Sequence, residues 1–155
     1  MKARMEPRDF YEAAPATVKA LRSIGEATKA SGLDPLLIEL VKIRASQING
    51  CAYCVEMHTR EAHEAGESEA RLHLLAVWRE SPFFTARERA ALGWTEALTL
   101  LAEDRAPDAV YEEARREFSA AELAQLTSVI AMINAWNRIG VGFRFLHPTT
   151  APKRT

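Results

Sequence analysis

Apolar residues recur at the spacing of an α-helix along almost the whole chain. The clearest apolar stripe follows Asp34 and Pro35 and consists of Leu36, Leu37, Leu40, Val41 and Ile48. Residues three or four positions apart lie on one face of a helix, so such a stripe is typical of a helix that packs against a core. Alternating β-branched runs bounded by turns, which are typical of strands, are absent from the sequence. We therefore expect an all-α fold, a bundle of six to eight helices.

Capping residues and helix breakers divide this pattern into separate helices. Two pairs of residues, Thr85 with Glu88 and Ser119 with Glu122, fit the capping box that opens many helices. The expected helices extend from Pro15 to about Ser31–Gly32, from Pro35 to Asn49, from Cys51 to Ala65, from Ser68 to Ser81, over 86–102, over about 108–117 and over 120–139. We expect them to form one domain that spans residues 1–155, because this length is typical of a single compact domain.

Composition and charge exclude several classes of function. The chain is 48% hydrophobic and 26% charged, which is ordinary for a globular protein, and its formal net charge of -1 gives no field that would attract a polyanion. Nucleic acid is therefore not an expected partner. The N-terminal residues lack the apolar core of a signal peptide, and no run of about 18 uncharged apolar residues could cross a bilayer. We expect a cytoplasmic protein without a membrane partner.

The densest group of reactive side chains is the stretch 51–58, whose sequence is Cys-Ala-Tyr-Cys-Val-Glu-Met-His. It contains the only two cysteines of the chain, Cys51 and Cys54, and one of its four histidines, His58. At positions i, i+3 and i+7 of a helix, the two sulfurs and the imidazole share one face. In a reducing compartment, a close cysteine pair indicates redox catalysis or a metal site rather than a structural disulfide.

A reactive cysteine in this stretch requires a device that favours the thiolate, because a free thiol with a pKa of about 8.5 is only slightly ionised at neutral pH. The unpaired N–H groups at the start of the helix and the Cys-x-x-Cys spacing both act in this direction. His58 lies one turn after Cys54, where it could accept the thiol proton. Glu39 lies on the preceding helix among apolar residues and needs a partner, so we expect it to orient His58.

Glu39 followed by Cys51-x-x-Cys54-x-x-x-His58 resembles the core motif of the AhpD-like alkylhydroperoxidases, within the carboxymuconolactone decarboxylase superfamily. The segments 40–50 and 133–138 are also similar to small single-domain members of this family, so the resemblance covers roughly residues 10–148. It implies an AhpD-like helical fold that assembles as a homo-oligomer, a trimer or a hexamer.

The resemblance also implies a role for each residue of the motif. Cys54 would attack the peroxide and Cys51 would resolve the sulfenic acid, while His58, with Glu39 behind it, would relay the protons that activate Cys54. A dithiol donor, which in this family can be a lipoyl group on a partner protein, would then reduce the disulfide, and no bound cofactor is expected.

Tyr53 departs from the family, because the better-studied peroxidases carry a histidine between the cysteines. A phenol with a pKa near 10 cannot act as a base at neutral pH, so Tyr53 bears on peroxidase efficiency and on the class of peroxide.

The sequence therefore predicts a thiol-dependent alkylhydroperoxidase in antioxidant defence, and other interpretations stay open. A disulfide oxidoreductase or redox sensor would use the same cysteines to exchange with protein thiols, and Tyr53 keeps this alternative open. A zinc site could be formed by Cys51, Cys54 and His58, with Glu39 or another histidine as the fourth ligand. The chain could also be a non-enzymatic helical oligomer with the cysteines as small core residues. Decarboxylation is not expected, since that branch of the family generally lacks the cysteine pair.

Overall fold

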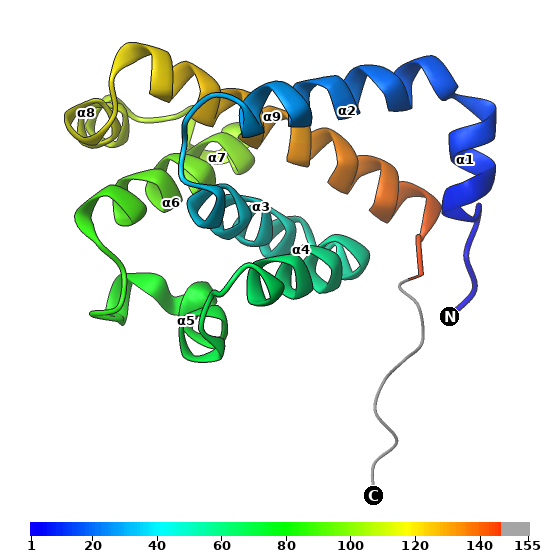
Figure 1. Ribbon diagram of the computed structural model, residues 1–155, viewed down its shortest axis with the longest axis horizontal. Coiled ribbons are helices and arrows are strands. Elements are labelled where there is room, and N and C mark those ends of the chain that lie inside the picture. The colour runs from blue at the N-terminus through cyan, green and yellow to red at the C-terminus, as the bar shows by residue number, and fades with distance from the viewer. Residues whose placement is uncertain (147–155) are drawn as a thin grey trace, which may run out of the picture.

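The computed structural model describes residues 1–146, and within them every regular element is a helix (Figure 1). The elements are α1 (Pro7–Ala13), α2 (Pro15–Lys29), α3 (Pro35–Asn49), α4 (Ala52–Glu64), α5 (Glu69–Leu74), the 3-10 helix η1 (Leu75–Glu80), α6 (Ala86–Thr99), α7 (Leu101–Asp104), α8 (Asp108–Glu117) and α9 (Ala120–Phe143). The expected all-α fold is confirmed for this part of the chain, whereas residues 147–155 of the predicted domain lie outside it. Over the same range no single helix is long and apolar enough to span a membrane, although α8 and α9 reach that composition when counted together across a 120° bend.

α3 is the central helix of the bundle. It packs against α4, α6 and α9, and Figure 1 shows it running between α9 and α4. Its buried residues lie on all sides of the helix rather than on one stripe, and Leu40 and Val41 are 0% exposed. A helix that is buried on all sides is typical of the middle of a protein core. A polar side chain on this helix, such as Glu39, must therefore find its partners within the protein.

The turn between α3 and α4 determines where the cysteines lie. At the start of α3, the Asp34 side chain accepts a hydrogen bond from the N–H of Leu36 at 3.0 Å, as its capping role predicts. At the end of α3, Gly50 adopts the left-handed conformation, with φ 67°, which residues with a side chain rarely adopt. This turn makes Cys51 the residue that caps α4.

The helix boundaries agree with the predicted capping boxes at α6 and α9 and differ elsewhere. The apolar spacing along the sequence does not predict α1. This helix is short and has no buried residue, so its sequence needs no apolar stripe. The helix expected over 86–102 is interrupted at Leu100, whose backbone leaves the helical region, and α7 follows. α9 continues past the expected end at 139 to Phe143, where Phe143 and Phe145 pack on Phe10 of α1. The short helices α1 and α7 raise the α-helices of the described residues to nine, above the expected six to eight.

A group of amide side chains joins α9 to the end of α3. The Asn49 amide donates to the side-chain oxygens of Asn134 and Asn137, at 3.0 and 2.9 Å. Asn137 in turn donates to the Ser46 hydroxyl at 2.9 Å. Because Asn137 is 1% exposed, these bonds replace the ones that water would make in the unfolded chain. The network holds the C-terminal half of α9 beside the turn that carries Cys51.

Candidate active site

The two cysteines lie at the start of α4 and are joined by a disulfide. Their Cα atoms are 5.4 Å apart, within the range that disulfides span. Both residues are buried, with exposed fractions of 2% for Cys51 and 4% for Cys54. The apolar residues that cluster with them are Ala45, Ile133, Tyr53 and Trp136. A pair of cysteines this close can pass between dithiol and disulfide without a rearrangement of the fold.

Cys51 is enclosed between the start of α4 and the side of α9. Its Sγ accepts a hydrogen bond from the backbone N–H of Cys54 at 3.4 Å. N–H groups at a helix start stabilise negative charge, so this contact favours a thiolate on Cys51. On the α9 side the packing is tight, since a Cβ added at Gly140 would lie 3.0 Å from the Cys51 sulfur and 3.7 Å from that of Cys54.

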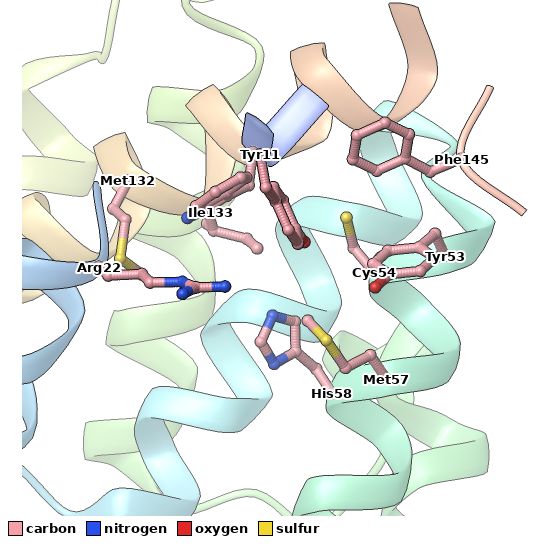
Figure 2. Close-up of a pocket in the computed structure, with 10 residues that line it drawn as sticks. Tyr11, Arg22, Tyr53, Cys54, Met57, His58, Met132, Ile133 and Phe145 are labelled. Carbon is pink, nitrogen blue, oxygen red and sulfur yellow. The ribbon is translucent and has the colours of Figure 1, made fainter. Parts of the chain in front are cut away.

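A cavity of about 220 Å³ lies beside Cys54 (Figure 2). Its lining residues are Tyr11, Arg22, Tyr53, Cys54, Met57, His58, Met132, Ile133, Trp136 and Phe145. Figure 2 shows Cys54 and His58 of α4 on one side of the cavity, with Tyr11 of α1 and Arg22 of α2 reaching it from the other. Cys51 is not part of this lining, so Cys54 is the sulfur that a small molecule in the cavity would meet.

A buried charged cluster lies behind His58. Glu39 accepts a hydrogen bond from the Lys42 ammonium at 2.6 Å through Oε1, and its Oε2 lies 2.9 Å from Nδ1 of His58. The same Nδ1 lies 3.2 Å from Oε2 of Glu61. Glu39, Lys42 and His58 are each less than one-tenth exposed, at 8%, 5% and 7%. The structure thus brings together Glu39 and His58 as the sequence predicts, and Nε2 is the imidazole nitrogen that these carboxylates leave free.

The cluster changes the proton affinity of both members of the Glu39–His58 pair. Burial alone would raise the pKa of Glu39, but the hydrogen bond to His58 and the charge of Lys42 outweigh it, so this pKa is lowered. Burial alone would lower the pKa of His58, but its hydrogen bonds to Glu39 and Glu61 outweigh this effect and raise it above 6.5. Glu39 is therefore held as a carboxylate, and His58 takes up a proton more readily than an ordinary histidine.

Tyr53, the residue between the cysteines, packs with its ring edge against Phe145, with 5.7 Å between ring centres. Burial raises the pKa of Tyr53, and the neighbouring Tyr11 raises it further. The phenol is therefore protonated at neutral pH, where it can donate a hydrogen bond but cannot serve as a base.

Several residues of the site are not among those expected from the sequence. Lys42 and Glu61 could have been predicted from their spacing. Lys42 lies three positions after Glu39 on α3, and Glu61 lies three positions after His58 on α4. Tyr11 and Arg22 carry no such signal, because they reach the cavity from helices far from the motif in sequence.

The geometry does not favour the zinc alternative. Across residues 1–146, the group whose potential ligand atoms lie within 4.8 Å of one another consists of Glu39, His58 and Glu61, and neither cysteine belongs to it. The sulfurs are bonded to each other, and one Glu39 oxygen is held by the Lys42 ammonium, which competes with a metal ion for that carboxylate.

The fold and the site together define an all-helical protein with a Cys-x-x-Cys disulfide beside a buried carboxylate–imidazole pair. Residues 15–97 match the sequence profile of the Carboxymuconolactone decarboxylase family. The chain belongs to this family, as an AhpD-like member.

Relatives and solved structures agree with this membership. The uncharacterized protein YdfG of Bacillus subtilis is 39% identical over 132 residues, which cover 85% of this chain and 90% of the relative. The crystal structure of ATU0492 from Agrobacterium tumefaciens, a protein of unknown function with a suggested role in antioxidant defence as AhpD, has a TM-score of 0.90 at 46% identity and covers 96% of this chain and 99% of that one. The debrominase Bmp8 shares the fold, with a TM-score of 0.77 at 17% identity over 89% of this chain and 74% of its own.

The Glu39–His58 contact predicts an unusual titration of this histidine. By NMR, the pKa of His58 should lie above 6.5 in the wild type and fall in Glu39→Gln, which removes the buried negative charge. Since folding raises this pKa, the proton stabilises the fold fully below pH 6.5 and progressively less as the pH rises through the folded-state pKa. Glu61→Gln should cause a smaller decrease, and Glu64→Gln, at the exposed end of α4, should cause none. An equal His58 pKa in wild type and Glu39→Gln would contradict this assignment.

The close approach of α9 predicts that Gly140 controls the redox equilibrium of the cysteine pair. In Gly140→Ala, the new methyl group would press on the Cys51 sulfur, whose position the disulfide restricts and the dithiol does not. Overpacking of this kind costs about 1–3 kcal/mol, so the equilibrium in a glutathione buffer should shift toward the dithiol by about fivefold or more. Gly142→Ala is the matched control on the same helix, because a Cβ there meets nothing within 4 Å. An equal dithiol–disulfide ratio in Gly140→Ala and Gly142→Ala would show that the contact at Gly140 does not influence the redox equilibrium.

Proposed function

We propose that this protein is a thiol-dependent peroxidase that reduces hydroperoxides with Cys54 as the attacking thiolate. The observation that carries the proposal is the unequal placement of the two sulfurs. Cys54 borders the cavity together with His58, while Cys51 is enclosed behind it. The suggested antioxidant role of the Agrobacterium tumefaciens protein, which is 46% identical over nearly the whole chain, supports the same function.

In the first step, His58 accepts the proton of the Cys54 thiol. The neighbouring Glu39 carboxylate stabilises the imidazolium that forms, which favours the thiolate. The thiolate attacks the terminal oxygen of ROOH, the O–O bond breaks, and Cys54 becomes a sulfenic acid. The leaving alkoxide RO⁻ takes a proton from the imidazolium and departs as the alcohol ROH.

In the second step, Cys51 resolves the sulfenic acid. Its thiolate attacks the Cys54 sulfur, forming the S–S bond seen in the structure and releasing hydroxide, which is protonated to water. The Cys51 sulfur already receives the N–H of Cys54 at 3.4 Å, and this contact favours the anionic form that the attack requires.

A dithiol partner completes the cycle. One of its thiolates attacks the Cys54 sulfur from the cavity, and Cys51 leaves as a thiolate stabilised at the start of α4. The second thiol of the partner then displaces Cys54 and closes the partner's own disulfide. The sum is ROOH plus a dithiol giving ROH, water and a disulfide, and it requires no bound cofactor. A lipoyl group on a partner protein is the reductant we propose, within a cytoplasmic homo-oligomer, a trimer or a hexamer.

A disulfide oxidoreductase or redox sensor is the second candidate. Tyr53 favours it, because its protonated phenol cannot assist as a base in the place where the better-studied peroxidases carry a histidine. In that case the cysteines would exchange with protein thiols, and peroxide would react only slowly.

Stopped-flow kinetics with cumene hydroperoxide and pre-reduced protein separate the two candidates. Wild type should be oxidised rapidly, with loss of both thiols. Cys54→Ser should lose the reaction, whereas Cys51→Ser should react once and accumulate a sulfenic acid that a dimedone probe traps. If all three proteins react equally slowly, the peroxidase proposal is wrong and the sensor interpretation gains support.

A further inference from the structure

Arg22 introduces a permanent positive charge into a largely apolar cavity. It reaches the cavity from α2, and Figure 2 shows its guanidinium directed inward, on the opposite side from Cys54. The apolar and aromatic side chains that line the rest of the cavity include Tyr53, Met57, Met132, Ile133, Trp136 and Phe145. A molecule that fills this space would therefore have an apolar body, with the reactive sulfur at one end and a cation at the other.

The guanidinium of Arg22 is positioned by an aromatic ring rather than by a carboxylate. Its central carbon lies 5.2 Å from the centre of the Tyr11 ring, a distance typical of cation–π contacts. Within the described part of the chain, Arg22 forms no salt bridge, not even with Glu26 one turn further along α2. A guanidinium held over a ring keeps its N–H edge available, and this edge matches the two oxygens of a carboxylate.

Arg22 also lies at the boundary of the cavity. Together with Tyr11 it lines a second, outer hollow on the surface of α2, which includes Lys19 and Glu26. The two side chains therefore border both hollows, and the charged end of a bound molecule would lie beside Arg22, which is exposed to solvent. This placement avoids the cost of burying a carboxylate completely.

We propose that the cavity selects hydroperoxides that carry a carboxylate at the end remote from the peroxide, and that Arg22 binds this carboxylate. The inference rests on the proposed peroxidase function and names its substrate class. The peroxide group would lie at Cys54, the apolar body among the aromatic and methionine side chains, and the carboxylate at Arg22. The carboxylate takes no part in the oxidation of Cys54 and acts only in binding.

The test compares the para-carboxylate of cumene hydroperoxide with the methyl ester of the same compound. The two share the peroxide and the aromatic body and differ by one negative charge. Because Arg22 is exposed, we expect wild type to prefer the carboxylate by about five- to tenfold in kcat/KM, through a lower KM. Arg22→Gln should remove the preference, because kcat/KM falls more for the carboxylate than for the ester, and Arg22→Lys should retain part of it.

Lys19→Gln is the matched control, since it removes a positive charge one turn away on α2 from a residue that does not line the cavity. It should retain the preference. The inference is overturned if wild type does not distinguish the two compounds, if Arg22→Gln still prefers the carboxylate, or if Lys19→Gln loses the preference equally.

Binding of the corresponding alcohols, which have no peroxide, separates this inference from the proposed function. Calorimetry should show tighter binding of the carboxylate alcohol than of its ester by wild type, and no difference for Arg22→Gln. This result would stand even if no variant consumed peroxide, in which case the peroxidase proposal alone would fail. Equal binding of the two alcohols by wild type would contradict the role of Arg22 whatever the turnover.

Discussion

The contact between Glu39, Lys42 and His58 is the interaction on which the candidate site depends. The Glu39 carboxylate lies in the middle of α3 and is largely buried, so its charge must be compensated within the protein. Lys42 supplies a positive charge from the same helix, and His58 supplies a hydrogen bond from α4. The pairing therefore joins α3 to α4 and raises the pKa of His58. Cys54 lies one turn before His58 on α4 and both line the cavity, so we expect the same contact to favour negative charge on the Cys54 sulfur.

The second constraint is the packing of α9 against the disulfide. The amide network of Asn49, Asn134 and Asn137 holds α9 at the end of α3, and Gly140 then allows the helix to approach the Cys51 sulfur closely. Cys51 is enclosed as a result, and Cys54 is left beside the cavity. Two cysteines that are chemically alike in sequence thereby acquire different surroundings, and this difference is what a division into attacking and resolving thiols requires.

The part of this structure that depends on local sequence could be predicted well. The apolar spacing, the Asp34 cap and the two capping boxes act within a few residues, and the all-α architecture and most helix boundaries follow from them. The Glu39–His58 pair could also be expected, because a buried carboxylate needs a partner. The cavity could not be predicted, because its walls come from α1, α2, α4, α9 and the segment after α9, which only the tertiary packing brings together. Tyr11 shows the difficulty, since it lies on a helix with no buried residue and hence no apolar pattern.

The central claim is that the Glu39–His58 contact favours the Cys54 thiolate, and the alkylation rate of Cys54 tests it most directly. In Cys51→Ser, Cys54 is the single thiol of the chain, so the rate with iodoacetamide at neutral pH reports its thiolate fraction. Adding Glu39→Gln to this variant should slow alkylation by about fivefold or more, provided that circular dichroism shows the protein to be folded. Adding Glu64→Gln instead should leave the rate unchanged. Equal alkylation rates with and without Glu39→Gln would contradict the account.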